Sequence, residues 1–350
     1  MAFEPDYRHI ADAAVNRRPA RLPLYEHVID PGLMGTILNE PMGLPSEPSR
    51  SDVYHYMDQM CRFFRETAYD TVSWEGGVGN ILPGSGAIMG GKPGPIQNRA
   101  DFEKYPWDDL PRRYWEKFTP YFEGIEKALL PGMKAVGGVG LGVFEISEDL
   151  VGYEWLCLLQ YDDPDLFRDL YVRIGDLLVR LWQDLLPRFG DSFCVCRMGD
   201  DLGFKSNTLL APATLRQHVI PQYRRIIAEA RKAGKPFLLH SCGKIFDVME
   251  DIIGAGISAK HSNEDQIAPF MEWIDRYGGR IGLFGGIDVN VLCLKSPEDI
   301  FRIVKEQGAQ FRARAGGYAL GSGNSIPKYV PVENYLAMVR ACRELRETGK

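Results

Sequence analysis

The second half of the chain alternates short apolar runs with amphipathic helical patterns. From about Asp191 onward, each apolar run ends in a turn with glycine or carboxylates, and a helical pattern follows. The runs are SFCVCRMGDD, KPFLLHSCG, ISAKHSNED, RIGLFGGID and GGYALGSGN. Parallel neighbouring strands need crossover connections, so five such units in series predict a parallel sheet.

The first half of the chain is less regular, but it contains further candidate strands. These are RLPLYEHV, YDTVSWE and KAVGGVG, separated by helical stretches such as SDVYHYMDQMCRFFRETA. Together with the five later runs they give eight strands, which predicts an α/β protein of the (β/α)8 TIM barrel type with an N-terminal helical extension. An open doubly wound sheet is the main alternative. We expect one domain over residues 1–350, because such barrels commonly use roughly 250 residues or more.

A segment rich in glycine and proline interrupts the first half. It reads GGVGNILPGSGAIMGGKPGPIQN and spans residues 76–98. A segment this long and irregular is not a simple connection between two elements. We predict that it forms a binding loop over the barrel mouth.

Composition and net charge indicate which kinds of binding partner this protein can have. The chain has 350 residues, 45% of them hydrophobic, and a formal net charge of -6, without a basic stripe. Nucleic acid and anionic membranes are therefore poor partners, and a small-molecule site is favoured. The N-terminus lacks a signal-peptide core, and no run of about 18 apolar residues is present, so we expect a cytoplasmic protein. The cysteines number seven and are widely spread, which predicts free thiols.

Polar side chains recur directly after the apolar runs, at the predicted C-terminal end of each strand. In a barrel, the loops after the strands converge on one face, and active sites lie on that face. The residues at these positions are Asp200, Asp201, His240, Cys242, His261, Glu264, Asp288, Ser322 and Asn324.

One pair of these residues has the spacing of metal ligands. His240 and Cys242 are two residues apart, so on a strand they project from the same side. An imidazole and a thiolate so placed can bind one Zn²⁺, whereas the alternative is a buried cysteine beside a hydrogen-bonded histidine. Catalytic zinc usually takes a third protein ligand, and the spacing does not choose among His261, Glu264, Asp200, Asp201, Glu26, Glu75 and His27. Cys194 and Cys196 share the spacing but lie deeper in their strand.

Several of these segments resemble the uroporphyrinogen decarboxylase superfamily. The resemblance rests on RMGDDLGF, LLHSCGKIFDVMEDIIGAGI, LFGGIDVNVL and GSGNSIPKYVPVENYLAMV, and it covers most of the chain from about Arg21. It implies a barrel of the kind shared by decarboxylases and cobalamin-dependent methyltransferases.

The methyltransferase branch holds zinc with a His-x-Cys pair and a later cysteine. His240 and Cys242 match the pair, whereas Ser322 stands at the position of the later cysteine. The decarboxylase branch carries an arginine-rich first-strand segment that receives substrate carboxylates. This chain has LYEHVIDPG there, with Glu26, His27 and Asp30, so such a mouth would repel a polycarboxylate.

The resemblance therefore favours a zinc-dependent methyltransferase that moves a methyl group between methylcobalamin, carried on a partner corrinoid protein, and a thiol or tetrahydrofolate acceptor. A decarboxylase or lyase and a noncatalytic corrinoid- or ligand-binding barrel are the alternatives, and a homodimer is implied by resemblance alone. The residues assigned to zinc are His240, Cys242 and His261, those assigned to catalysis are Asp200, Asp201, Glu264 and Asp288, and those assigned to cofactor binding are Ser322 and Asn324.

Overall fold

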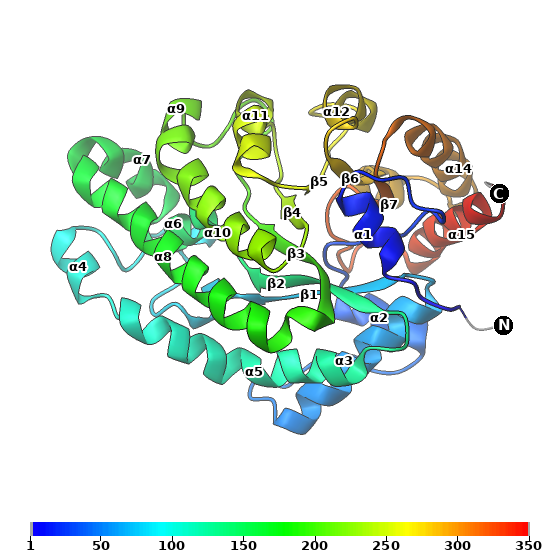
Figure 1. The fold of residues 1–350 in the computed structure, drawn as a ribbon, viewed down its shortest axis with the longest axis horizontal. Coiled ribbons are helices and arrows are strands. Elements are labelled where there is room, and N and C mark those ends of the chain that lie inside the picture. The colour runs from blue at the N-terminus through cyan, green and yellow to red at the C-terminus, as the bar shows by residue number, and fades with distance from the viewer. Residues whose placement is uncertain (1–2, 349–350) are drawn as a thin grey trace.

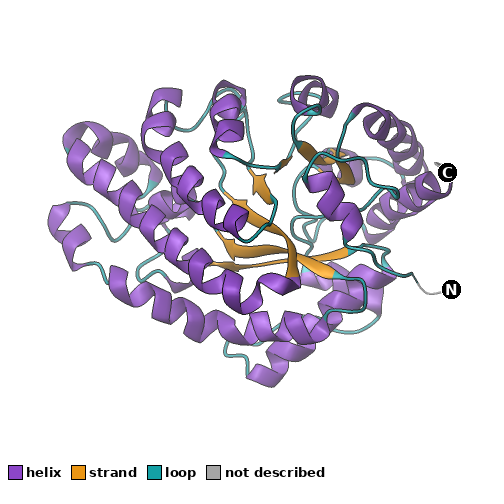
Figure 2. Cartoon of the chain, viewed as in Figure 1, coloured by secondary structure: helices purple, strands orange, loops and turns teal. Residues whose placement is uncertain are grey.

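A computed structural model describes residues 3–348 as an α/β fold built on one curled, all-parallel sheet (Figures 1 and 2). The strands lie in the sheet in chain order, β1 to β7. They are β1 (Thr71–Gly77), β2 (Lys134–Gly140), β3 (Phe193–Gly199), β4 (Phe237–His240), β5 (Ala259–His261), β6 (Gly282–Ile287) and β7 (Tyr318–Ser322). The five strands predicted after Asp191 are confirmed, and so are two of the three predicted before it.

Helices surround the sheet, and those between β1 and β7 lie in the connections between successive strands (Figure 2). They are α1 (Arg8–Ala14), α2 (Pro31–Leu38), α3 (Arg50–Glu66), α4 (Arg99–Lys104), α5 (Leu110–Ala128), α6 (Val143–Val151), α7 (Tyr153–Asp162), α8 (Pro164–Phe189), α9 (Pro212–Thr214), α10 (Ile220–Lys232), α11 (Phe246–Ala255), α12 (Phe270–Tyr277), α13 (Val289–Leu294), α14 (Pro297–Arg314) and α15 (Val332–Thr348). Within residues 3–348, no helix has both the length and the apolar character needed to cross a membrane.

The first predicted strand, residues 21–28, is not a regular strand. It meets β7 through one parallel bridge, between Leu24 and Leu320, with hydrogen bonds from Tyr25 N to Leu320 O and from Leu320 N to Pro23 O, each 2.9 Å. Among the described residues it forms no bridge to β1. A proline inside a strand removes a backbone donor, which explains the short pairing. The sheet is thus TIM-barrel-like, with seven regular strands and an irregular segment where the eighth was predicted.

The N-terminal helix closes one end of the curled sheet. Helix α1 packs against β3, β6 and β7 (Figure 1). A Cβ at Gly282 or at Gly317 would lie 2.1 Å from the carbonyl oxygen of Ala13, so the helix touches the sheet backbone directly. Because these glycines precede or begin their strands, the opposite end of the sheet is left for the residues that follow the strands.

The segment of residues 76–98 lies against helix α6. It contains the short 3-10 helices η1 (Val78–Ile81) and η2 (Ala87–Met89). The backbone N–H of Ile96 donates to Leu150 O, and that of Gly94 donates to Val151 O, each at 2.9 Å. The side chain of Asp149 accepts hydrogen bonds from the N–H groups of Gly86 and Ile88. The segment is thus tied to the helix that follows β2; its predicted role as a binding loop stays a prediction.

Candidate metal centre

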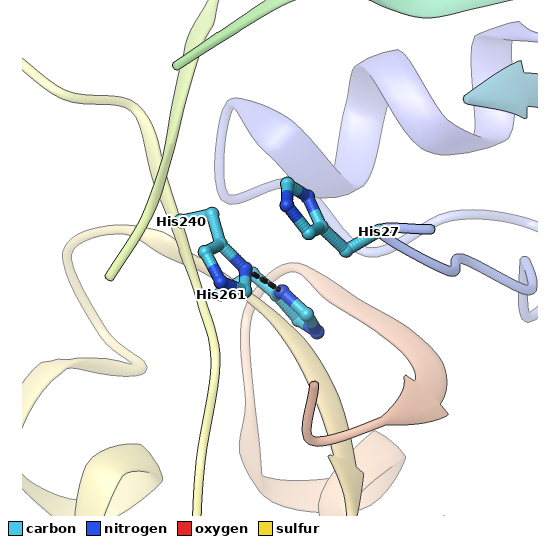
Figure 3. Close-up of side chains that lie close together, drawn as sticks. All are labelled: His27, His240 and His261. Carbon is cyan, nitrogen blue, oxygen red and sulfur yellow. Dashed lines mark hydrogen bonds between the residues drawn. The ribbon is translucent and has the colours of Figure 1, made fainter. Parts of the chain in front are cut away.

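Two histidines meet at the ends of neighbouring strands. The parallel register of β4 and β5 pairs His240 with His261. Their side chains turn toward one another, and the two Nδ1 atoms lie 2.7 Å apart (Figure 3). One of these nitrogens must donate a proton and the other must accept it.

The second hydrogen bond of His261 decides which nitrogen donates. Its Nε2 lies 3.0 Å from the carbonyl oxygen of Ser322, which can only accept, so the proton of His261 is on Nε2. The Nδ1 of His261 then accepts from Nδ1–H of His240. Burial lowers the pKa of His261 to about 3 and that of His240 well below its usual value, so both rings are neutral. The lone pair of His240 Nε2 is left free, as in a metal ligand oriented through its other nitrogen.

That free nitrogen faces a thiol and a carboxylate. Cys242 Sγ lies 3.4 Å from His240 Nε2, and Asp201 Oδ1 lies 3.7 Å from it. The backbone N–H of Cys242 donates to Asp201 Oδ1 at 2.8 Å, which joins the two loops. The three potential ligand atoms lie within 4.8 Å of one another. His240 and Cys242 lie close together as expected, but β4 ends at His240 and Cys242 lies in the loop after it, not on the strand. Asp201 completes a group of three potential ligands.

The sulfur of Cys242 is surrounded by hydrogen-bond donors. Asn324 Nδ2 lies 3.4 Å from Sγ, and Ser262 Oγ lies 3.5 Å from it. Burial raises the pKa of the Cys242 thiol to about 12, and the charge of Asp201 adds to this. A nearby cation favours the thiolate, and the buried ammonium of Lys260 acts in that direction. Without a metal, the thiol therefore keeps its proton near neutral pH.

Ser322 does not face the sulfur. Its hydroxyl contacts Oε2 of the buried Glu26 and lies 2.9 Å from the carbonyl oxygen of Asn324, and its N–H donates to Glu26 Oε1 at 2.8 Å. Burial raises the pKa of Glu26 to about 8. A hydroxyl has one proton, so a protonated Glu26 donates to Ser322, and Ser322 donates to Asn324. The position that resembles a zinc cysteine serves here to hold a buried carboxylic acid.

This buried acid makes a testable contribution to stability. The pKa of Glu26 is about 8 in the folded protein against a usual 4.5, so between these values only the folded state binds the proton. Stability is therefore full below about pH 4.5 and falls as pH rises toward 8. In Glu26→Gln, whose amide cannot ionise, we expect this loss to disappear. The variant should exceed the wild type by a few kcal/mol at pH 8, since one pKa shift unit is worth ~1.4 kcal/mol.

Urea unfolding of both proteins at pH 5, 6.5 and 8 measures this difference. The other titrating groups are common to the two proteins, so they cancel in the comparison. Equal slopes of stability against pH would show that Glu26 is ionised in the folded state.

His27 lies over the ring of His240. It comes from the irregular N-terminal segment, and the two rings stack with centroids 3.8 Å apart and planes 9° apart (Figure 3). His27, His240 and His261 form a second group of potential metal ligands within 4.8 Å. Both ring nitrogens of His261 already bond to protein atoms, however, so this group offers fewer free lone pairs than the group with Cys242.

Asp200 serves the fold rather than the open site. Its carboxylate accepts hydrogen bonds from Phe144 N at 3.0 Å, Glu145 N at 2.8 Å and Tyr223 Oη at 2.6 Å. It thereby caps the start of α6. Burial raises its pKa to about 6. Its predicted catalytic role stays a prediction, but the structure brings Asp201, not Asp200, to the sulfur.

The remaining predicted residues line a second part of the mouth. Asp288 caps α13 through Asn290 N and also accepts from Asp265 N, each at 2.7 Å. Glu264, Asp288 and Asn324 are among the residues lining a cavity of about 370 Å³. Asn324 therefore joins this cavity to the sulfur of Cys242.

Two acidic residues that the sequence analysis missed lie on helix α6. Burial, with the charges of Asp200 and Asp201 nearby, raises the pKa of Glu145 to about 9 and that of Glu148 to about 8. Both therefore hold protons near neutral pH. Their spacing of three residues, just after the predicted strand KAVGGVG, is the signal that could have placed them on one helical face.

Comparisons with known proteins place this geometry in context. No curated protein matches the sequence. The structure is similar to that of a methyltransferase from Methanosarcina mazei, with a TM-score of 0.76, 17% identity and coverage of 98% of this chain and 99% of that one. It is also similar to a B12-independent methionine synthase from Shewanella sp. W3-18-1 in complex with selenomethionine, with a TM-score of 0.53, 12% identity and coverage of 96% and 98%. At these identities the likeness shows a shared fold.

A family model gives a more specific result. The model described as uroporphyrinogen decarboxylase (URO-D) matches residues 92–345, which is more than half of the chain. The matched span contains strands β2 to β7, and it contains Asp201, His240, Cys242 and His261. The chain therefore belongs to the uroporphyrinogen decarboxylase family.

Proposed function

We propose that this protein is a zinc-dependent methyltransferase whose metal is held by His240 Nε2, Cys242 Sγ and a carboxylate oxygen of Asp201. The observation that carries the proposal is the free lone pair of His240 Nε2, which points at a thiol and a carboxylate. One imidazole, one thiolate and one carboxylate are all accepted zinc ligands, and three protein ligands leave a position open for substrate. The likeness in fold to a methyltransferase supports the choice of reaction.

The proposal changes the role given to His261. From the sequence it was assigned to the metal, but it bonds to His240 Nδ1 at 2.7 Å and to Ser322 O at 3.0 Å. We therefore propose that it fixes the tautomer and the ring orientation of His240 from behind, as a positioning residue.

When bound, zinc would lower the pKa of a coordinated thiol, or polarise an acceptor nitrogen, so that the acceptor attacks a methyl group near neutral pH. The chain's own residues would supply the surroundings. Asn324 Nδ2 donates a hydrogen bond to the sulfur of Cys242, and Ser262 Oγ lies 3.5 Å from it. Glu148, with a pKa of about 8, holds a proton that it can exchange near neutral pH. The cavity beside Asn324 would admit the acceptor.

The methyl carrier and the acceptor follow from the resemblance. We propose methylcobalamin on a partner corrinoid protein as the carrier, and a thiol or tetrahydrofolate as the acceptor. A decarboxylase or lyase and a noncatalytic ligand-binding barrel are the alternatives within this family's fold.

Metal analysis combined with a turnover assay tests the proposal. Protein purified without chelator is expected to carry about one zinc per chain, and to demethylate methylcobalamin in the presence of a thiol or tetrahydrofolate, followed by absorbance. Zinc without turnover would favour a binding role or another reaction. Protein that binds no zinc on reconstitution would contradict the proposal.

A further inference from the structure

The cavity that has Asn324 in its wall carries an excess of negative charge. Its volume is about 370 Å³, and its lining includes two acidic residues and three amides, namely Glu264, Asp288, Asn263, Asn290 and Asn324. None of the described residues in this lining is a lysine, an arginine or a histidine. A cavity whose lining charges have one sign attracts ligands of the opposite sign.

Asp288 already has partners for its carboxylate. Its two oxygens accept hydrogen bonds from the backbone N–H groups of Asn290 and Asp265, each at 2.7 Å. Asp288 is also 5% exposed and lies at the start of α13, where the helix dipole favours an anion. The helix therefore offsets part of its charge, and Glu264 is the acidic residue of this lining that is more open to a ligand.

The carboxylate of Glu264 lacks a protein partner. Within residues 3–348, it forms no hydrogen bond and no ion pair. The nearby Lys260 is 2% exposed, contacts Ser262 O, and holds its Nζ 3.8 Å from the ring centroid of Trp273, so it does not line the cavity. Lys328 is exposed and is not part of the lining either. The negative charge of Glu264 is therefore available to a ligand.

The cavity begins one side chain away from the proposed metal ligands. Asn324 lines it, and Asn324 Nδ2 lies 3.4 Å from Cys242 Sγ. A small acceptor that binds the metal through its sulfur would extend its other end past Asn324 and toward Glu264.

We propose that the methyl acceptor is a small thiol that carries an ammonium group, with the ammonium at the carboxylate of Glu264. This inference rests on the proposed function and names the acceptor class of the same site. The ammonium would also meet the ring of Tyr329, which lines the cavity and can attract a cation. A sulfonate or carboxylate in the same place would meet a like charge. Tetrahydrofolate, whose tail ends in carboxylates, is disfavoured for the same reason.

Three thiols of matched length test the proposal: 2-mercaptoethylamine, 2-mercaptoethanol and 2-mercaptoethanesulfonate. Calorimetric titration of the zinc-loaded protein at pH 7 should give the tightest binding for the amine and the weakest for the sulfonate. The acidities of the three thiols differ, so variants of Glu264 supply the decisive comparison. In Glu264→Gln, the amine should bind about threefold to tenfold more weakly, while 2-mercaptoethanol changes by less than about twofold. Glu264→Lys should favour the sulfonate over the amine.

A second measurement needs neither zinc nor methyl transfer. In the metal-free protein, the partly exposed Cys242 is modified with 2-aminoethyl or 2-sulfonatoethyl methanethiosulfonate, and mass spectrometry of its peptide gives the two rates. The ratio of the cationic to the anionic rate should fall about threefold or more in Glu264→Gln. Glu306→Gln, at an exposed position of α14 outside the lining, is the matched control and should keep the wild-type ratio.

These results separate the acceptor class from the proposed function. An unchanged rate ratio in a folded Glu264→Gln, or equal losses of the amine and of 2-mercaptoethanol, overturns the inference even if the protein binds zinc and transfers methyl groups. A protein that binds no zinc but shows the expected fall in the ratio contradicts the proposed function and supports the preference of this cavity for cations.

Discussion

Replacement of Cys242 by serine is expected to remove the bound zinc and the methyl transfer that depends on it. A serine hydroxyl is a poor zinc ligand at neutral pH, and the site would keep only His240 and Asp201. We expect the zinc content to fall from about one per chain to below roughly a tenth after dialysis, measured by inductively coupled plasma mass spectrometry. Serine is only slightly smaller than cysteine and can keep a polar contact with Asn324. We therefore expect the Cys242→Ser protein to fold.

A matched variant separates this effect from a general effect of thiol loss. Cys293 lies on α13, is partly exposed and belongs to neither group of potential metal ligands. Cys293→Ser should therefore keep full zinc. Asp201→Asn should lower zinc content as well, because it removes the proposed third ligand. Stoichiometric zinc in a folded Cys242→Ser would rule out the proposed ligand set.

The strand-end position of the site could be predicted because it depends on local patterns. Each apolar run after Asp191 ends in a polar residue at the same phase, and a parallel sheet gathers such ends on one face. His240 and His261 are the last residues of their strands, and the parallel register of β4 and β5 pairs them. The period of two along a strand predicted a shared side for His240 and Cys242. The two side chains do meet, but β4 ends at His240, so the loop that follows the strand places Cys242.

The partners of these residues could not be predicted, because they depend on contacts between distant parts of the chain. Glu26 and Ser322 are 296 positions apart, and their hydrogen bonds decide that the serine turns away from the sulfur. Asp200 caps a helix that begins more than 50 residues earlier, so its carboxylate is occupied. Adjacent Asp200 and Asp201 look equivalent in the sequence, and only the packing of α6 separates their roles.

The irregular N-terminal segment shows a different limit of prediction from the sequence, because a strand pattern there did not form a regular strand. Apolar residues around Leu24 have the period of a strand, but the segment forms a single bridge to β7 and, among the described residues, none to β1. This irregularity allows His27 to lie over His240 and opens a cavity beside Trp74. A regular eighth strand would have filled that gap with backbone hydrogen bonds.

The role of His261 gives the second large expected effect, and two substitutions distinguish a positioning residue from a ligand. In His261→Phe, nothing accepts the proton of His240 Nδ1, so the ring of His240 is free to turn and to change tautomer. Loss of such a partner typically costs 10- to 100-fold in metal affinity. In His261→Gln, the amide oxygen can accept from His240 Nδ1–H, and the amide nitrogen can donate to Ser322 O.

We therefore expect His261→Gln to bind zinc within about tenfold of the wild type, and His261→Phe to bind it 10- to 100-fold more weakly. Competition with a chromophoric chelator measures both affinities, and thermal unfolding of the two apo variants confirms that they are folded. If His261 were itself a zinc ligand, glutamine would be as poor a replacement as phenylalanine, because a neutral amide oxygen binds zinc far less well than imidazole. Equal, large losses in the two variants would thus return His261 to the metal and remove Asp201 from the ligand set.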